Sequence, residues 1–251
     1  MKSIAELAER VRLTDRVQTH PMGSRFLEGS PEAWDFSALP TVLIAYPADQ
    51  VVTVSTHLSL DEIQSELNRT GQWIPFVPGV ATGLPDHASL RGFLDTRLPH
   101  PAVGTFGSWR DWVLGATVVL ASGEVVKSGC RAVKSVAGFD LHKLVLGARG
   151  KLGIITEVHL RTWPLASRVE GESRTAPHGL WVAQCPFSRV DAWREALGDR
   201  CLEHDALSGQ FWGTGEVPAG ADWVWHEGQP LPEDRWTRRA LELFDPTGKL
   251  N

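Results

Sequence analysis

The glycine-rich segment over residues 134–160 constrains the fold more than any other part of the sequence. It reads KSVAGFDLHKLVLGARGKLGIITEVHL, with a G-x-x-G-x-x-G spacing at Gly147, Gly150 and Gly153. The pattern predicts a short helix before these glycines and an alternating, β-branched strand over 154–163 after them. A Rossmann fingerprint has the opposite order, in which a strand precedes G-x-G-x-x-G and a helix follows. The segment is therefore not a Rossmann motif, which argues against NAD as the main cofactor.

Two interpretations of these glycines stay open on the local pattern. Backbone without a side chain can approach a phosphate or a ring closely, as in a nucleotide-binding loop. Glycine is equally suited to ending a helix and turning the chain into a strand. The spacing alone does not choose between a ligand site and a connection.

The rest of the chain reads as a mixture of helices and strands. Two capping boxes, each a serine followed three residues later by a glutamate, predict helix starts at Ser3 and Ser59. Two β-branched runs around the turn 121–124 predict a hairpin over 113–129. Residues 79–108 show no long periodicity and read as a loop, and loops of this length in compact domains are often functional. Further strands are predicted over 51–56, 73–79, 180–187, 208–215 and 221–228, and further helices after Asp140, after Ser188 and over 232–244.

The short helix after Asp140 has an expected buried face. Leu141, Leu144 and Val145 stand at helical spacing and should pack inward together. His142 should then face solvent.

Composition and charge exclude several classes of function. The net charge of -5 carries no basic footprint for nucleic acid. The three cysteines, Cys130, Cys185 and Cys201, form no C-x-x-C pair, so neither a disulfide framework nor a zinc site is expected. No apolar run approaches the roughly 18 residues of a membrane span. The charged, amphipathic N-terminus does not read as a signal peptide, so the expected compartment is the cytoplasm.

A longer pattern over residues 107–164 resembles a known family. RDWVLG, SGEVV, KSVAGFDL and GARGKLGIITE follow one another with the order and spacing of RDxVLG, DGEV, KNVAGYDL and GxxGTLGVITE. These are motifs of the PCMH-type FAD-binding domain of the vanillyl-alcohol oxidase superfamily. The chain is most similar to the FAD-binding subunits of bacterial glycolate oxidase and to their D-lactate dehydrogenase relatives. Weaker likenesses are PMGSR to the pyrophosphate loop, SLRGF to a T-x-GG stretch and FDPTGKLN to the closing FDPxGxxNPG.

The resemblance implies a fold and an activity. The expected fold is α+β, with two α+β FAD-binding subdomains over 1–78 and 79–165 and a shortened cap domain over 166–251. The implied activity is that of a FAD-dependent oxidoreductase, as a subunit of a complex that oxidises glycolate, D-lactate or another small 2-hydroxy acid. The implied partners are a full-length flavin subunit and an iron–sulfur subunit, through which any membrane association would run.

The resemblance also implies which residues contact FAD. Most of these contacts would use backbone groups in turns, where consecutive N–H groups bind phosphate and a missing Cβ leaves room for a ring. The first four residues would hold the pyrophosphate, the last five the adenine and ribose, and the others the flavin end and the channel between. The implied cofactor-binding residues are Met22, Gly23, Ser24, Arg25, Pro78, Gly79, Ser89, Gly92, Gly107, Ser108, Arg110, Asp111, Lys134, Gly138, Phe139, Asp140, Gly147, Gly150, Gly153, Ile154 and Ile155.

Some side chains depart from the family pattern. Met22 replaces a glycine of the pyrophosphate loop, and Arg91 replaces a glycine of the T-x-GG stretch, so both would narrow the FAD channel. Two classes of function therefore stay open. We favour a FAD-binding oxidoreductase subunit, and the alternative is a non-catalytic scaffold subunit that has lost FAD and binds partner subunits. No catalytic residue is assigned, because solvated loop positions account for His87 and His100 better than the role of a base does.

Overall fold

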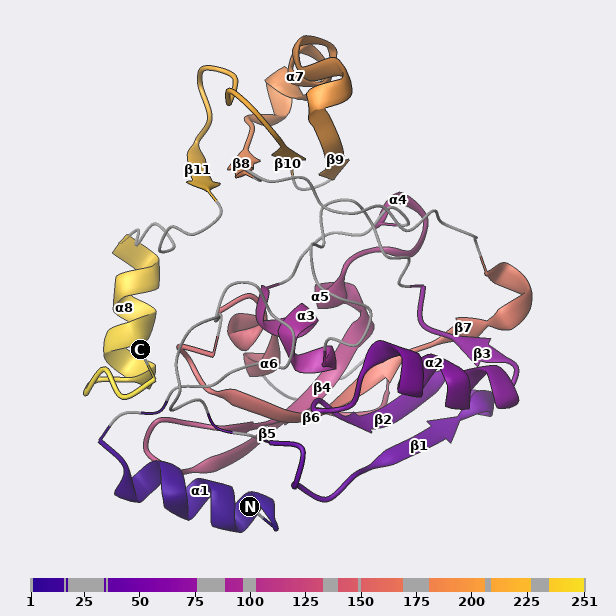
Figure 1. Cartoon of the computed structure of the whole chain (residues 1–251), viewed down its shortest axis with the longest axis vertical. Helices are drawn as coiled ribbons and strands as arrows, with labels where there is room; N and C mark the ends of the chain where they lie inside the picture. Colours follow the sequence, from indigo (N-terminus) through magenta and orange to yellow (C-terminus); the bar gives the residue numbers. More distant parts are fainter. Residues whose placement is uncertain are drawn as a thin grey trace.

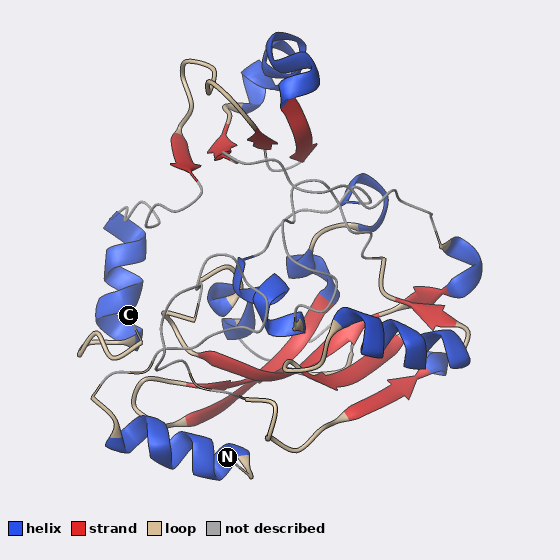
Figure 2. Ribbon diagram, viewed as in Figure 1, coloured by secondary structure: helices blue, strands red, loops and turns tan. Residues whose placement is uncertain are grey.

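The computed structural model describes residues 2–15, 17, 34, 36–75, 89–96, 103–132, 140–148, 150–168, 181–205, 209–226 and 235–250. Within them, an antiparallel five-stranded sheet of order β1-β2-β6-β4-β5 is the centre of the larger body (Figure 1). Helices lie on both sides of this sheet (Figure 2). Its strands are β1 Leu43–Tyr46, β2 Val51–Ser55, β4 Val113–Val119, β5 Val125–Gly129 and β6 Ile154–Arg161. The helices of this body are α1 Ile4–Leu13, α2 Leu60–Arg69, α3 Leu90–Thr96, α4 Val103–Phe106, α5 Trp109–Trp112 and α6 Leu141–Val145.

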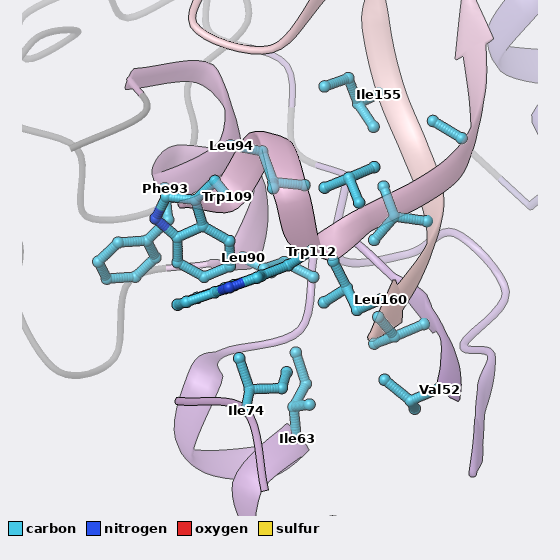
Figure 3. Packing of buried hydrophobic residues seen from close by; sticks show 14 of the residues in the cluster. Val52, Ile63, Ile74, Leu90, Phe93, Leu94, Trp109, Trp112, Ile155 and Leu160 are labelled. Atoms are coloured by element: carbon cyan, nitrogen blue, oxygen red, sulfur yellow. The ribbon is translucent and has the colours of Figure 1, made fainter. Parts of the chain in front are cut away.

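Large apolar side chains attach α2, α3 and α5 to one face of the sheet (Figure 3). Alternation along β6 turns Leu160 into this core, and Ile63 of α2 and Leu94 of α3 meet it from the helices. Trp109 and Trp112 are among the largest fully buried side chains, with ring centroids 4.9 Å apart in an edge-to-face arrangement. A second core holds α1 against the end of β4. Strand β3, Gln72–Trp73, pairs with β7, Trp163–Pro164, beside the first core.

A four-stranded antiparallel sheet of order β11-β8-β10-β9 forms a smaller body together with one helix. Trp181 and Phe211 from the strands and Trp193 from the helix are all buried in its core. Its elements are β8 Trp181–Gln184, α7 Val190–Leu197, β9 Cys201–Asp205, β10 Gln210–Gly213 and β11 Trp223–His226.

The chain then returns to the larger body through α8, Arg235–Phe244, and a closing turn. Asp245 is buried, and its carboxylate accepts the amides of Lys249 and Leu250, each at 2.7 Å. The Lys249 ammonium donates to the carbonyl of Val11 at the end of α1, at 3.0 Å, and the Lys249 carbonyl accepts the amide of Val17, at 2.7 Å. The last residues of the chain thus close the core around α1.

Local sequence patterns predicted many of these elements. The strand over 51–56, the hairpin over 113–129 and the capping box at Ser59 are confirmed, and Ser3 accepts the amide of Glu6 as the cap of α1. The prediction of a structureless loop over 79–108 is wrong, because α3 and α4 lie in it.

The predicted face of α6 is also wrong. His142 and Val145 are buried, whereas Leu144 is 46% exposed. A helix of five residues offers two overlapping apolar stripes, and packing selected the one that contains the histidine. The strand predicted over 73–79 is described only as β3 at its start, and Pro78 and Gly79 lie outside the described residues.

Candidate cofactor-binding site

The end of β2 joins β6 to α3 and forms the centre of the candidate site. Thr56 donates its amide to the carbonyl of Thr156, at 3.0 Å, and its hydroxyl to the carbonyl of Ile155, at 2.6 Å. Its own carbonyl accepts the amide of Arg91, at 2.8 Å. Since a buried backbone group must find a partner, these three bonds fix the start of α3 beside the start of β6. Thr56 was not predicted as part of the site.

The glycine-rich turn is hydrogen-bonded to the other end of α3. Gly147 donates its amide to the carbonyl of Leu94 near the end of α3, at 2.9 Å. Its φ of 81° and that of Gly150, 78°, lie in the region that favours glycine. A Cβ on Gly153 would lie 2.5 Å from Cγ1 of Val118. Conformation and packing thus account for these glycines as a helix-to-strand connection, and the predicted contacts with adenine and ribose stay a prediction.

Three predicted site residues act as local structure at the start of α5. The carboxylate of Asp111 accepts both the amide and the hydroxyl of Ser108, each at 2.8 Å. Gly107 has a φ of 83° just ahead of this capping box. Neighbouring charges at Arg110 and Asp111 also fit a turn-stabilising ion pair, but no such pair is among the ion pairs of the described residues. Arg110 is exposed.

Asp140 begins α6 without donating or accepting a side-chain cap bond. Its carboxylate instead pairs with Lys143, at 2.7 Å. The hydrogen bond from Lys143 holds the pKa of Asp140 below its usual value, and the charge of Arg110 acts in the same direction. Arg110 of α5 therefore lies close enough to Asp140 of α6 for its charge to stabilise the ionised carboxylate.

Helix α3 places ionisable groups in the interior. Arg91 and Asp95 are 4% and 2% exposed, and Arg91 Nε lies 3.9 Å from Asp95 Oδ2. Burial raises the pKa of Asp95 to about 7 against the opposing charge of Arg91. The Ser89 hydroxyl, one residue before α3, is 2% exposed and has no hydrogen-bond partner among the described residues. Nothing in the sequence signalled this burial, because charged residues normally face water.

The two histidines of this region have structural surroundings. Nδ1 of His142 lies 3.1 Å from the hydroxyl of Ser128, and Nδ1 of His159 lies 2.9 Å from that of Thr53. Burial lowers the pKa of both rings. Both are therefore held as neutral rings at pH 7, and the expectation that His142 faces solvent is wrong.

The described chain covers part of the predicted site. Ile155 accepts the hydroxyl of Thr56, Ser89 and Gly92 stand at the start of α3, and Gly147 is bonded to Leu94 near the end of that helix. Ile154 points into the second core. The predicted residues that lie outside the described residues are Met22, Gly23, Ser24, Arg25, Pro78, Gly79, Lys134, Gly138 and Phe139. Over the described ranges, no group of three or more His, Cys, Asp or Glu side chains could hold a metal ion. None of the helices in those ranges has the length and apolar character to cross a bilayer.

Comparison with known proteins finds relatives among D-lactate dehydrogenases and glycolate oxidase subunits. No family model matches the chain. It is 36% identical over 156 residues to the mitochondrial D-lactate dehydrogenase (cytochrome) of Arabidopsis thaliana, a match that covers 62% of this chain and 24% of the relative. It is 31% identical over 192 residues to glycolate oxidase subunit GlcE of Escherichia coli (strain K12), covering 66% of this chain and 53% of the relative.

Solved structures show a likeness of fold. An alkyldihydroxyacetonephosphate synthase superimposes with a TM-score of 0.52 at 17% identity, over 79% of this chain and 35% of that one. The predicted α+β fold is confirmed, and so is the resemblance to glycolate oxidase subunits and D-lactate dehydrogenases. The chain spans 53% of GlcE and 24% of the plant dehydrogenase.

Proposed function

We propose that the chain is a FAD-binding subunit of an oxidoreductase that acts on a small 2-hydroxy acid such as glycolate or D-lactate. The names of the relatives support the reaction class, since they include a glycolate oxidase subunit, D-lactate dehydrogenases and an FAD-linked oxidoreductase. FAD, when bound, would supply the acceptor for a hydride from the substrate α-carbon. The part of this chain would be to hold the cofactor and exclude water from it.

One observation carries the proposal of a cofactor at this place. Ser89 Oγ and both carboxylate oxygens of Asp95 are buried and have no hydrogen-bond partner among the described residues. Buried polar atoms are rarely left unpaired, because each loses its hydrogen bonds to water. Polar atoms of a bound ligand would satisfy them. They stand on or beside α3, and the turn at Gly147 is bonded to the end of this helix at Leu94, so the residues present fit a polar cofactor here.

The partners are part of the proposal. The support for them is the name of the relative GlcE, which describes it as a subunit of glycolate oxidase. We assign it a full-length flavin subunit and an iron–sulfur subunit as partners, and membrane association only through them. The subunit alone should oxidise glycolate or D-lactate poorly, and co-expression with a full-length flavin subunit should restore dye reduction. Robust turnover by the isolated chain would contradict the assignment.

The alternative of a scaffold subunit without FAD has support of its own. Arg91 stands where the family pattern has a glycine, and its side chain is buried beside Asp95. The amides of Gly147 and Gly153 are already bonded to protein carbonyls. On this alternative the same fold would serve only to assemble the complex.

A thermal shift experiment separates the two functions. FAD should raise the melting temperature of the purified chain, because a ligand that binds only the folded state stabilises it. FMN should raise it much less, since it lacks the adenosine half that the turn over 147–155 would contact. Saturation at about 100 times Kd corresponds to about 2.7 kcal/mol of added stability. Equal shifts with both flavins would contradict the adenosine contact, and no shift with either would favour the scaffold.

A further inference from the structure

Helix α3 has two buried faces of opposite character. Leu90, Phe93 and Leu94 lie in the apolar core on the sheet (Figure 3). Arg91 and Asp95 are four residues apart, so they share a second face of the helix. Both are nine-tenths buried or more, at 4% and 2% exposure. A helix that buries a charged face must direct it at something other than the apolar core.

The two charges of this face do not satisfy each other. The guanidinium of Arg91 lies over the ring of Phe36, with Cζ 4.0 Å from its centroid. Its Nε is 3.9 Å from Asp95 Oδ2, which is beyond hydrogen-bond distance. Neither oxygen of Asp95 has a hydrogen-bond partner among the described residues. The pair therefore gives Asp95 a Coulombic neighbour and leaves its oxygens open.

Asp245 shows how this same protein treats a structural buried carboxylate. It is 4% exposed, comparable to Asp95, yet its two oxygens accept the amides of Lys249 and Leu250, each at 2.7 Å. A carboxylate that serves the fold alone is thus saturated by backbone donors. Asp95 lacks such donors, which is the arrangement expected of a group that receives them from a ligand.

The chemistry of the open atoms defines the ligand group. Carboxylate oxygens accept hydrogen bonds, and the neighbouring Ser89 hydroxyl can both donate and accept. Hydroxyl groups match this set, because each can donate to Asp95 and exchange a bond with Ser89. Arg91 offsets the negative charge of Asp95, so a cofactor that carries phosphate groups is not repelled from the site. Resting on the proposed function, the hydroxyl-bearing group at this position is the polyol portion of FAD.

We propose that Asp95 is a cofactor-contacting residue that accepts hydrogen bonds from hydroxyl groups of FAD, with Arg91 as the residue that positions its carboxylate. The glycine-to-arginine change in the T-x-GG stretch then does not close the site. Arg91 and Asp95 together replace a backbone contact with a side-chain contact.

The test compares Asp95→Leu and Asp95→Asn with Asp61→Asn, which removes the same charge from an exposed position on α2. FAD affinity is measured by quenching of flavin fluorescence, and the stability of the protein without FAD by urea unfolding at pH 8. We expect Asp95→Leu to weaken FAD binding at least tenfold, Asp95→Asn to weaken it less, and Asp61→Asn to leave it unchanged. Without FAD, the isosteric Asp95→Asn should be at least as stable as the wild type, because it removes an unsatisfied buried charge.

The outcomes distinguish this inference from the proposed function. A wild-type chain that binds no FAD overturns both. A wild-type chain that binds FAD, with Asp95 variants of unchanged affinity, overturns the role of Asp95 alone. An Asp95→Asn protein that unfolds more easily yet binds FAD normally makes Asp95 a structural residue. Slower substrate oxidation at unchanged FAD affinity would assign Asp95 to the substrate and likewise overturn the cofactor contact.

Discussion

Replacing Asp245 by alanine should open the closing turn of the chain. The Asp245 carboxylate accepts two backbone amides, from Lys249 and Leu250, at 2.7 Å each. A hydrogen bond to a charged group contributes about 1.5–3 kcal/mol, so the two together contribute about 3–6 kcal/mol. If the turn detaches, the burial of Leu250 is lost as well, at about 1.5–3 kcal/mol. The whole loss is a large part of the roughly 5–15 kcal/mol typical of a folded protein.

Urea unfolding followed by tryptophan fluorescence measures this loss. Lys249→Met is the matched control, because it removes only the ammonium that donates to the carbonyls of Val11 and Arg12 and keeps the backbone bonds to Asp245. We expect the control to cost less, about 1.5–3 kcal/mol, because of its two bonds only the one to Val11 is partly buried and the one to Arg12 is exposed and longer, 3.3 Å. A cost below about 1 kcal/mol for Asp245→Ala, or one equal to that of the control, would refute the assignment of the turn as a clamp.

Two further predictions concern the candidate site. Gly150→Val should destabilise the protein without FAD by roughly 1 kcal/mol or more, because Gly150 has a φ of 78°; if the turn also contacts adenosine, the FAD affinity of the folded protein falls too, which melting and titration of one variant separate. The pKa of Asp95 is raised by burial from 3.8 to about 7, so its protonated form stabilises the fold below pH 4 and this contribution is lost as pH rises to about 7. A pKa shift of about three units corresponds to at most about 4 kcal/mol of stability. Urea unfolding should therefore show a lower stability of the wild type at pH 8 than at pH 5, and Asp95→Asn should lack this difference. An identical pH dependence in both proteins would contradict the raised pKa of Asp95.

The parts of the fold that were predictable depend on local chemistry. The capping box at Ser59 and the hairpin turn at Gly123 are written within a few residues, and both are confirmed. Helix α3 was missed although Leu90, Phe93 and Leu94 stand at helical spacing, because seven residues among glycines and prolines give a weak signal. The short strands β1 and β9 were missed as well, since their identity depends on the neighbours with which they pair.

The candidate site was predictable only where backbone makes it. Glycine positions have a conformational signature, and the structure gives a positive φ to Gly107, Gly147, Gly150 and Gly153. The burial of Asp95 has no such signature, because it depends on what covers the second face of α3. Apolar spacing in a sequence predicts which residues are buried. An ionisable residue normally faces water, so its burial depends on tertiary contacts that the local sequence does not show.

The contact between the closing turn and α1 has a consequence for folding. Leu250 packs in the same core as Leu7 and Val11 although it is far from them in the sequence, so the core around α1 is complete only when these distant segments have met. The smaller body over 181–226 has its own core, so it can fold before the segments on either side of it in the sequence have come together. Until the closing turn has docked, the face of α1 that packs on Leu250 stays exposed, and a chaperone that binds apolar surface would act there.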